Sequence, residues 1–131
     1  MAPTRAGIAA AATADPEFPI AARFWNATLR LDVGDRAHVL QVANGAITRE
    51  QALPASDPAA ATYTVRVAAP ESEWTRLLVP VPRPYYQDLF GAMSRHDFKV
   101  DGDVEAFFAY YPAVRRLVEL ARTLQPAGAT A

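Results

Sequence analysis

The side chains best suited to move a proton near neutral pH are two histidines, His38 and His96. His96 is followed directly by Asp97, an order that suggests a catalytic dyad. Residues 96–101 alternate between apolar and polar types, which predicts a β-strand, and neighbouring side chains of a strand point to opposite faces. His96 and Asp97 therefore cannot share a proton there. His38 falls in another alternating segment, as an ordinary polar or half-buried residue.

Other motifs that carry chemistry are weak or missing. Asp101-Gly102-Asp103 is similar to the start of a calcium loop, but no Glu follows at the twelfth position. We interpret it as a turn in which Asp103 caps a helix. The histidines lack H-x-x-x-H spacing, there is no cysteine, and no glycine-rich phosphate loop or G-x-S-x-G elbow occurs. The sequence thus predicts no catalytic residue, no metal and no cofactor.

The charges are balanced, with 13 basic against 14 acidic residues, and Lys99 is the single lysine. No basic cluster is present to neutralise phosphates, so we expect no nucleic-acid partner. No apolar run approaches the ~20 residues that span a bilayer, so we expect no stable membrane insertion. The absence of cysteine suits a reducing compartment, and we expect a cytoplasmic protein.

Large aromatic side chains gather in the second half of the chain, between residues 74 and 111. One sheet face and four short helices cannot close tightly over so many rings, so we expect a lined cavity that takes an apolar ligand. Burying ten methylenes would contribute about 8 kcal/mol before ordering costs. A tyrosine hydroxyl would fix a polar end of the ligand. The predicted ligand-binding residues are Trp74, Leu77, Leu78, Tyr85, Tyr86, Leu89, Phe90, Met93, Phe98, Phe107, Phe108 and Tyr111.

The elements that position these residues follow from periodicity. Gly34-Asp35 and Asn44-Gly45 are two-residue hairpin signals between alternating segments, which predicts a three-stranded meander. The period then changes to that of a helix, and Pro112 breaks or restarts the last helical stretch. We predict strands within 24–33, 38–42, 46–50, 62–68 and 96–101, and helices within 70–80, 85–93, 103–111 and 114–124.

This order, β-β-β-β-α-α-β-α-α, predicts an α+β fold: a five-stranded, mainly antiparallel sheet with helices packed on one face. By length the chain forms one domain, which we place at residues 21–125. Residues 1–20 are expected to be a disordered or loosely attached arm, and 126–131 a flexible tail. The alanine tract of the arm holds no Leu, Val or Phe, so we do not interpret it as a signal peptide.

Several segments resemble the sterol carrier protein-2 (SCP2-like) domain family. They are the meander at 28–35 and 39–45, the strand 63–67 that leads into the helix ESEWTRLL at 71–78, and the return strand that ends in Val100-Asp101-Gly102-Asp103. The resemblance covers roughly residues 24–124. It implies a five-stranded sheet covered by helices, with a hydrophobic tunnel for sterols, fatty acids or acyl-CoA. The family usually has a helix before its first strand, whereas residues 1–20 are poor helix material.

The leading hypothesis is non-enzymatic binding or carriage of a hydrophobic small molecule (a lipid, sterol or fatty acyl group) by a monomer or homodimer. One alternative is a small, cone-shaped α+β isomerase or hydrolase that acts on a hydrophobic substrate through His38 or His96. A further alternative is an accessory subunit that docks a partner enzyme through an exposed aromatic patch.

Overall fold

Five strands form one mixed sheet in the order β3-β2-β1-β4-β5. The computed structural model describes residues 7–125. All neighbouring strands are antiparallel except β1 and β4, which run parallel. The predicted α+β class and mainly antiparallel five-stranded sheet are thereby confirmed. The strands are β1 (Ala27–Val33), β2 (Arg36–Ala43), β3 (Ala46–Pro54), β4 (Val65–Ala69) and β5 (Lys99–Gly102).

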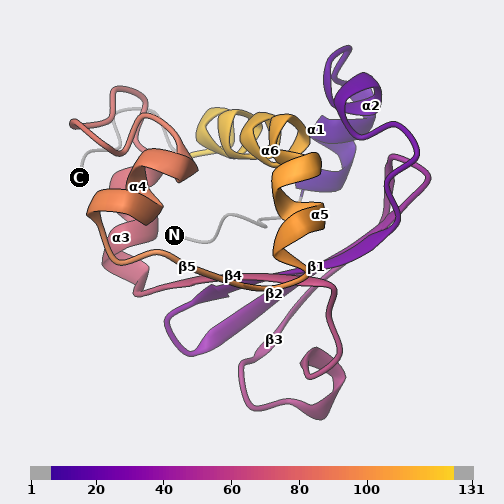
Figure 1. Ribbon diagram of the computed structural model, residues 1–131, viewed down its shortest axis with the longest axis horizontal. Coiled ribbons are helices and arrows are strands. Elements are labelled where there is room, and N and C mark those ends of the chain that lie inside the picture. The colour runs from indigo at the N-terminus through magenta and orange to yellow at the C-terminus, as the bar shows by residue number, and fades with distance from the viewer. Residues whose placement is uncertain (1–6, 126–131) are drawn as a thin grey trace.

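The helices cover one face of this sheet, and a 3-10 turn, η1 (Pro58–Ala60), lies in the loop on the other face (Figure 1). None of the helices within residues 7–125 is long and apolar enough to cross a membrane. The helices are α1 (Ile8–Ala14), α2 (Phe18–Ala21), α3 (Glu71–Leu77), α4 (Leu89–Arg95), α5 (Val104–Ala109) and α6 (Tyr111–Thr123).

The turn, cap and proline positions noted in the sequence coincide with turns and helix ends of the structure. Gly34 has φ 61° between β1 and β2, and Asn44 (φ 48°) and Gly45 (φ 81°) join β2 to β3 in the left-handed region that such turns require. Asp103 accepts a hydrogen bond of 3.0 Å from the Ala106 amide and so caps α5. Pro112 lies in the first turn of α6, where its missing N–H has no helical partner to lose.

The N-terminal segment differs from expectation. Residues 8–14 and 18–21 are helical, and Ile8, Ala12 and Phe18 are buried in the main core. The prediction of a loosely attached arm is therefore wrong for this part. Alanine is the best helix former, and one large apolar residue in each helix, Ile8 in α1 and Phe18 in α2, is buried in the core. Residues 1–6 and the predicted tail at 126–131 lie outside the described residues.

Several element boundaries also differ from the prediction; β3, for example, runs to Pro54 rather than ending at residue 50. The second helical stretch begins at Leu89 rather than at residue 85, because residues 80–88 form a proline-rich loop. The last strand begins at Lys99 rather than at residue 96. Phe24 precedes β1 with φ 71° and is exposed, so the first strand starts three residues later than its alternation suggests.

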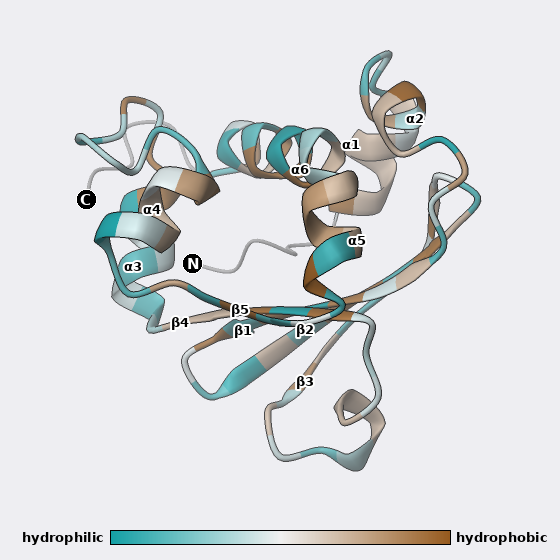
Figure 2. Cartoon of the chain, viewed as in Figure 1, coloured by the Kyte–Doolittle hydropathy of each residue, from teal (hydrophilic) through white to brown (hydrophobic). Residues whose placement is uncertain are grey.

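The core lies between the sheet and the helices, and Figure 2 shows hydrophobic residues along the strands and on the helices above them. The opposite face carries charge. Arg30 is buried and pairs with Asp32 at 2.6 Å, and Arg66 bridges Asp32 at 2.8 Å and Asp101 at 2.7 Å. This network ties β1, β4 and β5 together on the face of the sheet opposite the helices.

Candidate functional site

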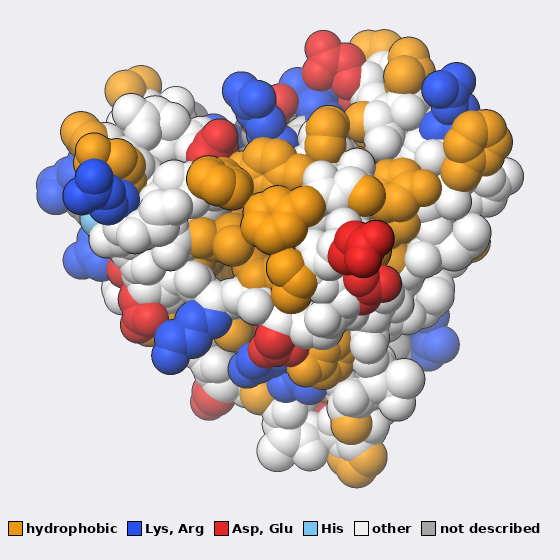
Figure 3. Space-filling model, in the orientation of Figure 1, with side chains coloured by type: hydrophobic (Ala, Val, Ile, Leu, Met, Phe, Trp, Pro, Cys, Tyr) orange, Lys and Arg blue, Asp and Glu red, His pale blue; other side chains and the backbone are white. Residues whose placement is uncertain are grey.

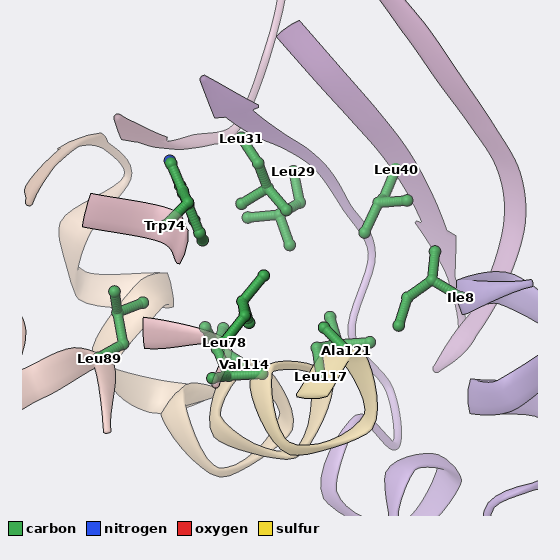
Figure 4. Close-up of a pocket in the computed structure, with 11 residues that line it drawn as sticks. Ile8, Leu29, Leu31, Leu40, Trp74, Leu78, Leu89, Val114, Leu117 and Ala121 are labelled. Carbon is green, nitrogen blue, oxygen red and sulfur yellow. The ribbon is translucent and has the colours of Figure 1, made fainter. Parts of the chain in front are cut away.

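An apolar cavity of about 30 Å³ lies between the sheet and α6 (Figure 4). A space of this size takes one or two water-sized groups. A lipid chain or ring system therefore enters only if the layers move apart. The cavity is lined by Ile8, Leu29, Leu31, Leu40, Trp74, Leu78, Leu89, Val114, Leu117, Val118 and Ala121.

The lining follows from two simple periodicities. Leu29 and Leu31 are two residues apart in β1 and so leave the sheet on the same face, opposite α6. Val114, Leu117 and Ala121 fall at i, i+3 and i+7 on α6 and form the stripe that faces the sheet. The two faces do not fully interlock, which leaves the cavity.

Among the eleven described lining residues, Trp74 is the only aromatic one. Its indole nitrogen donates a hydrogen bond of 2.8 Å to the carbonyl of Asp32, and its ring meets Phe98 edge-on at 5.0 Å. The one polar atom of this side chain is thus satisfied by the sheet. The eleven lining side chains offer dispersion contacts and no group for acid–base or nucleophilic chemistry.

Two arginines hold α6 over the cavity. Arg116 donates hydrogen bonds of 2.9 and 2.7 Å to the carboxylate of Asp15, just beyond α1. The guanidinium of Arg116 is the main reason that the pKa of Asp15 falls to about 2. It also contacts Glu17 at 3.2 Å and Glu119 at 3.1 Å. This clamp joins the middle of α6 to the N-terminal helices.

The second arginine is Arg122, near the end of α6. Its guanidinium donates to the backbone carbonyls of Leu77 at 2.8 Å, Tyr86 at 2.8 Å and Gln87 at 2.9 Å. Burial lowers the pKa of Arg122 from its ordinary value. This second clamp fastens α6 to the end of α3 and to the proline-rich loop.

Of the twelve residues that the sequence predicted as ligand contacts, Trp74, Leu78 and Leu89 line the cavity. Tyr86 is buried but turns its hydroxyl to the Glu73 carboxylate. The other members occupy the core or the surface. Leu77, Phe98 and Phe107 are buried in the core and Met93 packs against it, whereas Tyr85, Phe90 and Phe108 are exposed and Tyr111 is partly buried.

Four of the predicted rings form one aromatic cluster between α4, α5 and α6: Phe90, Phe107, Phe108 and Tyr111. Phe107 meets Phe108 at 5.2 Å and Tyr111 at 5.7 Å, and Phe90 lies 6.2 Å from both Phe108 and Tyr111. Phe90 is 50% exposed and Phe108 47%. Figure 3 shows hydrophobic side chains gathered over this part of the surface.

The two histidines lie apart. His96 ends α4 and stacks on Tyr86 with ring centres 3.7 Å apart, and it is not in the cavity lining. His38 is buried, and burial lowers its pKa. Among residues 7–125 neither histidine is hydrogen-bonded to a carboxylate, and no three His, Asp or Glu side chains gather in a metal-binding group.

Most of the lining residues were not predicted from the sequence, because the prediction selected large aromatic side chains and the lining is mainly aliphatic. The alternation of β1 and the apolar stripe of α6 were both visible, and they mark Leu31 and Leu117 as inward-facing. Ile8 carried a weaker signal, as the one large aliphatic residue in an alanine tract. Sequence patterns show which faces of the helices and strands are apolar. Whether a cavity remains between two apolar faces depends on how closely they pack in three dimensions.

No family model and no curated protein sequence matches the chain significantly. Solved structures do match. Sterol carrier protein 2 is 21% identical, with a TM-score of 0.75 over 91% of this chain and 93% of that chain. A conserved hypothetical protein from Thermus thermophilus is 21% identical, with a TM-score of 0.67 over 97% of this chain and 92% of its own.

A third structure, the UbiJ-SCP2 ubiquinone synthesis protein, is 18% identical, with a TM-score of 0.55 over 87% of this chain and 88% of its own. At these identities the likeness concerns the fold. The helix before the first strand, the feature that residues 1–20 were expected to lack, is present in this chain. The resemblance inferred from the strand motifs is confirmed: this chain has the fold of sterol carrier protein 2.

Proposed function

We propose that the protein binds and carries a hydrophobic small molecule, such as a lipid, sterol or fatty acyl group, between its sheet and α6, without converting it chemically. The observation that carries this proposal is the cavity, because every lining residue within 7–125 is apolar and the cavity lies between two layers of an SCP2-like fold. The absence of cysteine supports a reducing compartment, the cytoplasm, as the place where it acts.

The free energy gained by burying an apolar guest can offset the cost of moving α6 away from the sheet. Each methylene removed from water contributes about 0.8 kcal/mol, so a chain of ten contributes about 8 kcal/mol. Separating α6 from the sheet and ordering the guest consume part of this gain, so the net binding free energy is weaker than about −8 kcal/mol and the Kd lies above about 1 μM. Such binding suits a carrier, because the cargo must also leave.

The experiment is native mass spectrometry after incubation with dodecane or 1-dodecanol. The wild-type chain should form a complex with one guest molecule. Val114→Ile adds one methylene to the cavity wall and should weaken the complex, while Val104→Ile, on the exposed side of α5, should leave it unchanged. A wild-type chain that takes up neither guest contradicts the proposal.

A second candidate function is an accessory role, in which the aromatic cluster docks a partner enzyme. The observation that favours it is the half-exposed state of Phe90 and Phe108, since rings of this size tend to be buried when nothing binds them. The ubiquinone synthesis protein among the structural neighbours is consistent with service in a biosynthetic route. Phe108→Ser should then abolish partner capture without changing guest binding.

A further inference from the structure

Within residues 7–125, four buried side-chain polar atoms lack hydrogen-bond partners, and two of them, Nδ1 of His38 and Oε2 of Glu50, belong to neighbouring strands on the helical side of the sheet. His38 is only 5% exposed. Buried polar groups are almost always paired, because an unpaired one has lost its hydration without replacement. Two such atoms on neighbouring strands mark a place where a further group is expected to bind.

The strand register places both side chains beside the cavity. His38 and Leu40 are two residues apart in β2 and leave the sheet on the same face. Leu31 lies opposite His38 on one side, and Glu50 lies opposite Leu40 on the other. Leu31 and Leu40 both line the cavity. His38 and Glu50 are therefore diagonal neighbours that flank its wall, a spacing that long side chains can bridge.

Glu50 is also fixed from the helical side. Its Oε1 accepts a 3.4 Å hydrogen bond from the Ala9 amide, and the preceding residue, Ile8, lines the cavity. Figure 4 shows Ile8 and Leu40 at one end of the cavity, with Trp74 and Leu89 at the other. Glu50 is not itself a lining residue, but its carboxylate lies next to the end of the cavity formed by Ile8 and Leu40.

The chemistry of the two atoms selects a ligand group. Burial keeps the imidazole of His38 neutral by lowering its pKa, with a smaller contribution from Arg36, while Asp32 opposes the shift. A neutral imidazole nitrogen donates or accepts one hydrogen bond, depending on the tautomer. A carboxylate oxygen only accepts. A hydroxyl group satisfies both at once, because it donates one hydrogen bond and accepts others.

We infer that His38 and Glu50 form the polar end of the guest site and select a neutral amphiphile with a hydroxyl end over one with a free carboxylate. A carboxylate placed there would meet the charge of Glu50 in a poorly solvated space. The tyrosines expected from sequence to fix this polar end are used elsewhere: Tyr86 donates to Glu73, and Tyr111 accepts from the Phe90 amide. The inference rests on the proposed function and adds the class of guest.

The test compares three probes of equal chain length, 1-dodecanol, dodecanoate and dodecane, by competition at pH 7.5. The wild-type chain should bind the alcohol about tenfold more tightly than the carboxylate, the size of one charge-assisted hydrogen bond. Glu50→Gln and His38→Phe should each remove most of this preference. Matched controls are Glu105→Gln on α5 and His96→Phe at the end of α4, which lie on elements other than β2 and β3 and should leave the preference unchanged.

A second readout does not need the variants to fold. In wild-type protein, the 15N resonances of the His38 imidazole should shift when 1-dodecanol is added and stay in place with dodecane. If alcohol and carboxylate bind equally and His38 does not respond, the polar end is disproved while guest binding stands. If no probe binds, the proposed function itself fails, and the selection of a hydroxyl fails with it.

Discussion

Arg116 in the middle of α6 grips the carboxylate of Asp15, a residue 101 positions earlier in the chain, through two hydrogen bonds of 2.9 and 2.7 Å. The pair joins the N-terminal segment, which the sequence predicted to be a loosely attached arm, to α6, the helix that covers the cavity. Because Arg122 binds the proline-rich loop and the end of α3, polar contacts hold α6 at two points, Arg116 and Arg122. Between these points, apolar contacts hold α6 to the sheet.

The Asp15 clamp predicts a specific pH dependence. The folded pKa of Asp15 is about 2, below its ordinary value of 3.8, so the carboxylate stabilises the fold above pH 4 and ceases to do so as the pH falls through 2. Asp15→Asn should lower the melting temperature at pH 7. Its deficit against wild type should shrink between pH 4 and pH 2.

The control for this experiment is Glu17→Gln, which removes the exposed partner of the same guanidinium and should lower the melting temperature less. Calorimetry across the acid range checks both variants. A deficit of Asp15→Asn that stays constant down to pH 2 would show that the ion pair does not carry the effect.

Removing a cavity wall should cost stability and improve guest binding together. Leu78→Ala deletes buried atoms next to the cavity and should reduce the free energy of unfolding by about 2–5 kcal/mol. The enlarged space should raise the affinity for dodecane. Leu77→Ala is the matched control, since Leu77 is equally buried but does not line the cavity, and it should lose stability without gaining affinity. Denaturant titration with and without guest separates the two effects.

Tyr86→Phe should destabilise the link between α3 and the loop before α4. Burial raises the pKa of Glu73, but hydrogen bonds from Tyr86, the Asp97 amide and Arg76 outweigh it and hold the pKa below its ordinary value. Without the hydroxyl, the pKa of Glu73 should rise and the free energy of unfolding should fall by about 1–3 kcal/mol.

Because the folded pKa of Glu73 is depressed, its contribution to stability exists above the ordinary pKa of a glutamate and is lost as the pH falls through the folded value. The Tyr86→Phe deficit should therefore be largest near neutral pH. Tyr85→Phe is the control, because Tyr85 is 46% exposed. Its ring lies under the guanidinium of Arg95, a contact that the ring of Phe retains. NMR titration of Glu73 checks the shift, and an unchanged pKa in the variant refutes the assignment.

The turn between β5 and α5 should not tolerate a side chain. Gly102 has φ 96°, and a Cβ there would lie 2.3 Å from the carbonyl oxygen of Thr64. Gly102→Ala should cost about 3 kcal/mol or more. Gly34→Ala, also at positive φ but with no atom nearer than 3.9 Å, should cost about 1–2 kcal/mol. Equal losses in the two variants would mean that the contact with Thr64 relaxes freely.

The meander and the late helices were predictable because their signals are local. Asn44-Gly45 demands a tight hairpin, and the alternation of β1 defines its buried face without reference to the rest of the chain. The parallel pairing of β1 with β4 was not predictable in the same way, since it depends on where the 55–64 loop returns the chain. The burial of Ile8 depends likewise on distant residues, since it lines the cavity together with Leu40 of β2 and Leu117 of α6.

The sequence led us to expect an apolar cavity, but it did not identify most of the residues that line it. Aromatic crowding suggested a cavity lined by rings, yet Phe90 and Phe108 turn outward and mainly aliphatic residues such as Leu31 line the cavity. The register of β2 and β3, which brings His38 and Glu50 together, requires coordinates because a shift of one residue would put either side chain on the other face.

The most direct test of the account is NMR on methyl-labelled protein with unlabelled dodecane as guest. A guest held between the sheet and α6 should give intermolecular NOEs to Leu31 on the sheet and to Leu117 on α6, with smaller effects at the surface. NOEs confined to protons of the Phe90 and Phe108 rings, or no NOEs at all, would contradict a guest held between sheet and helix.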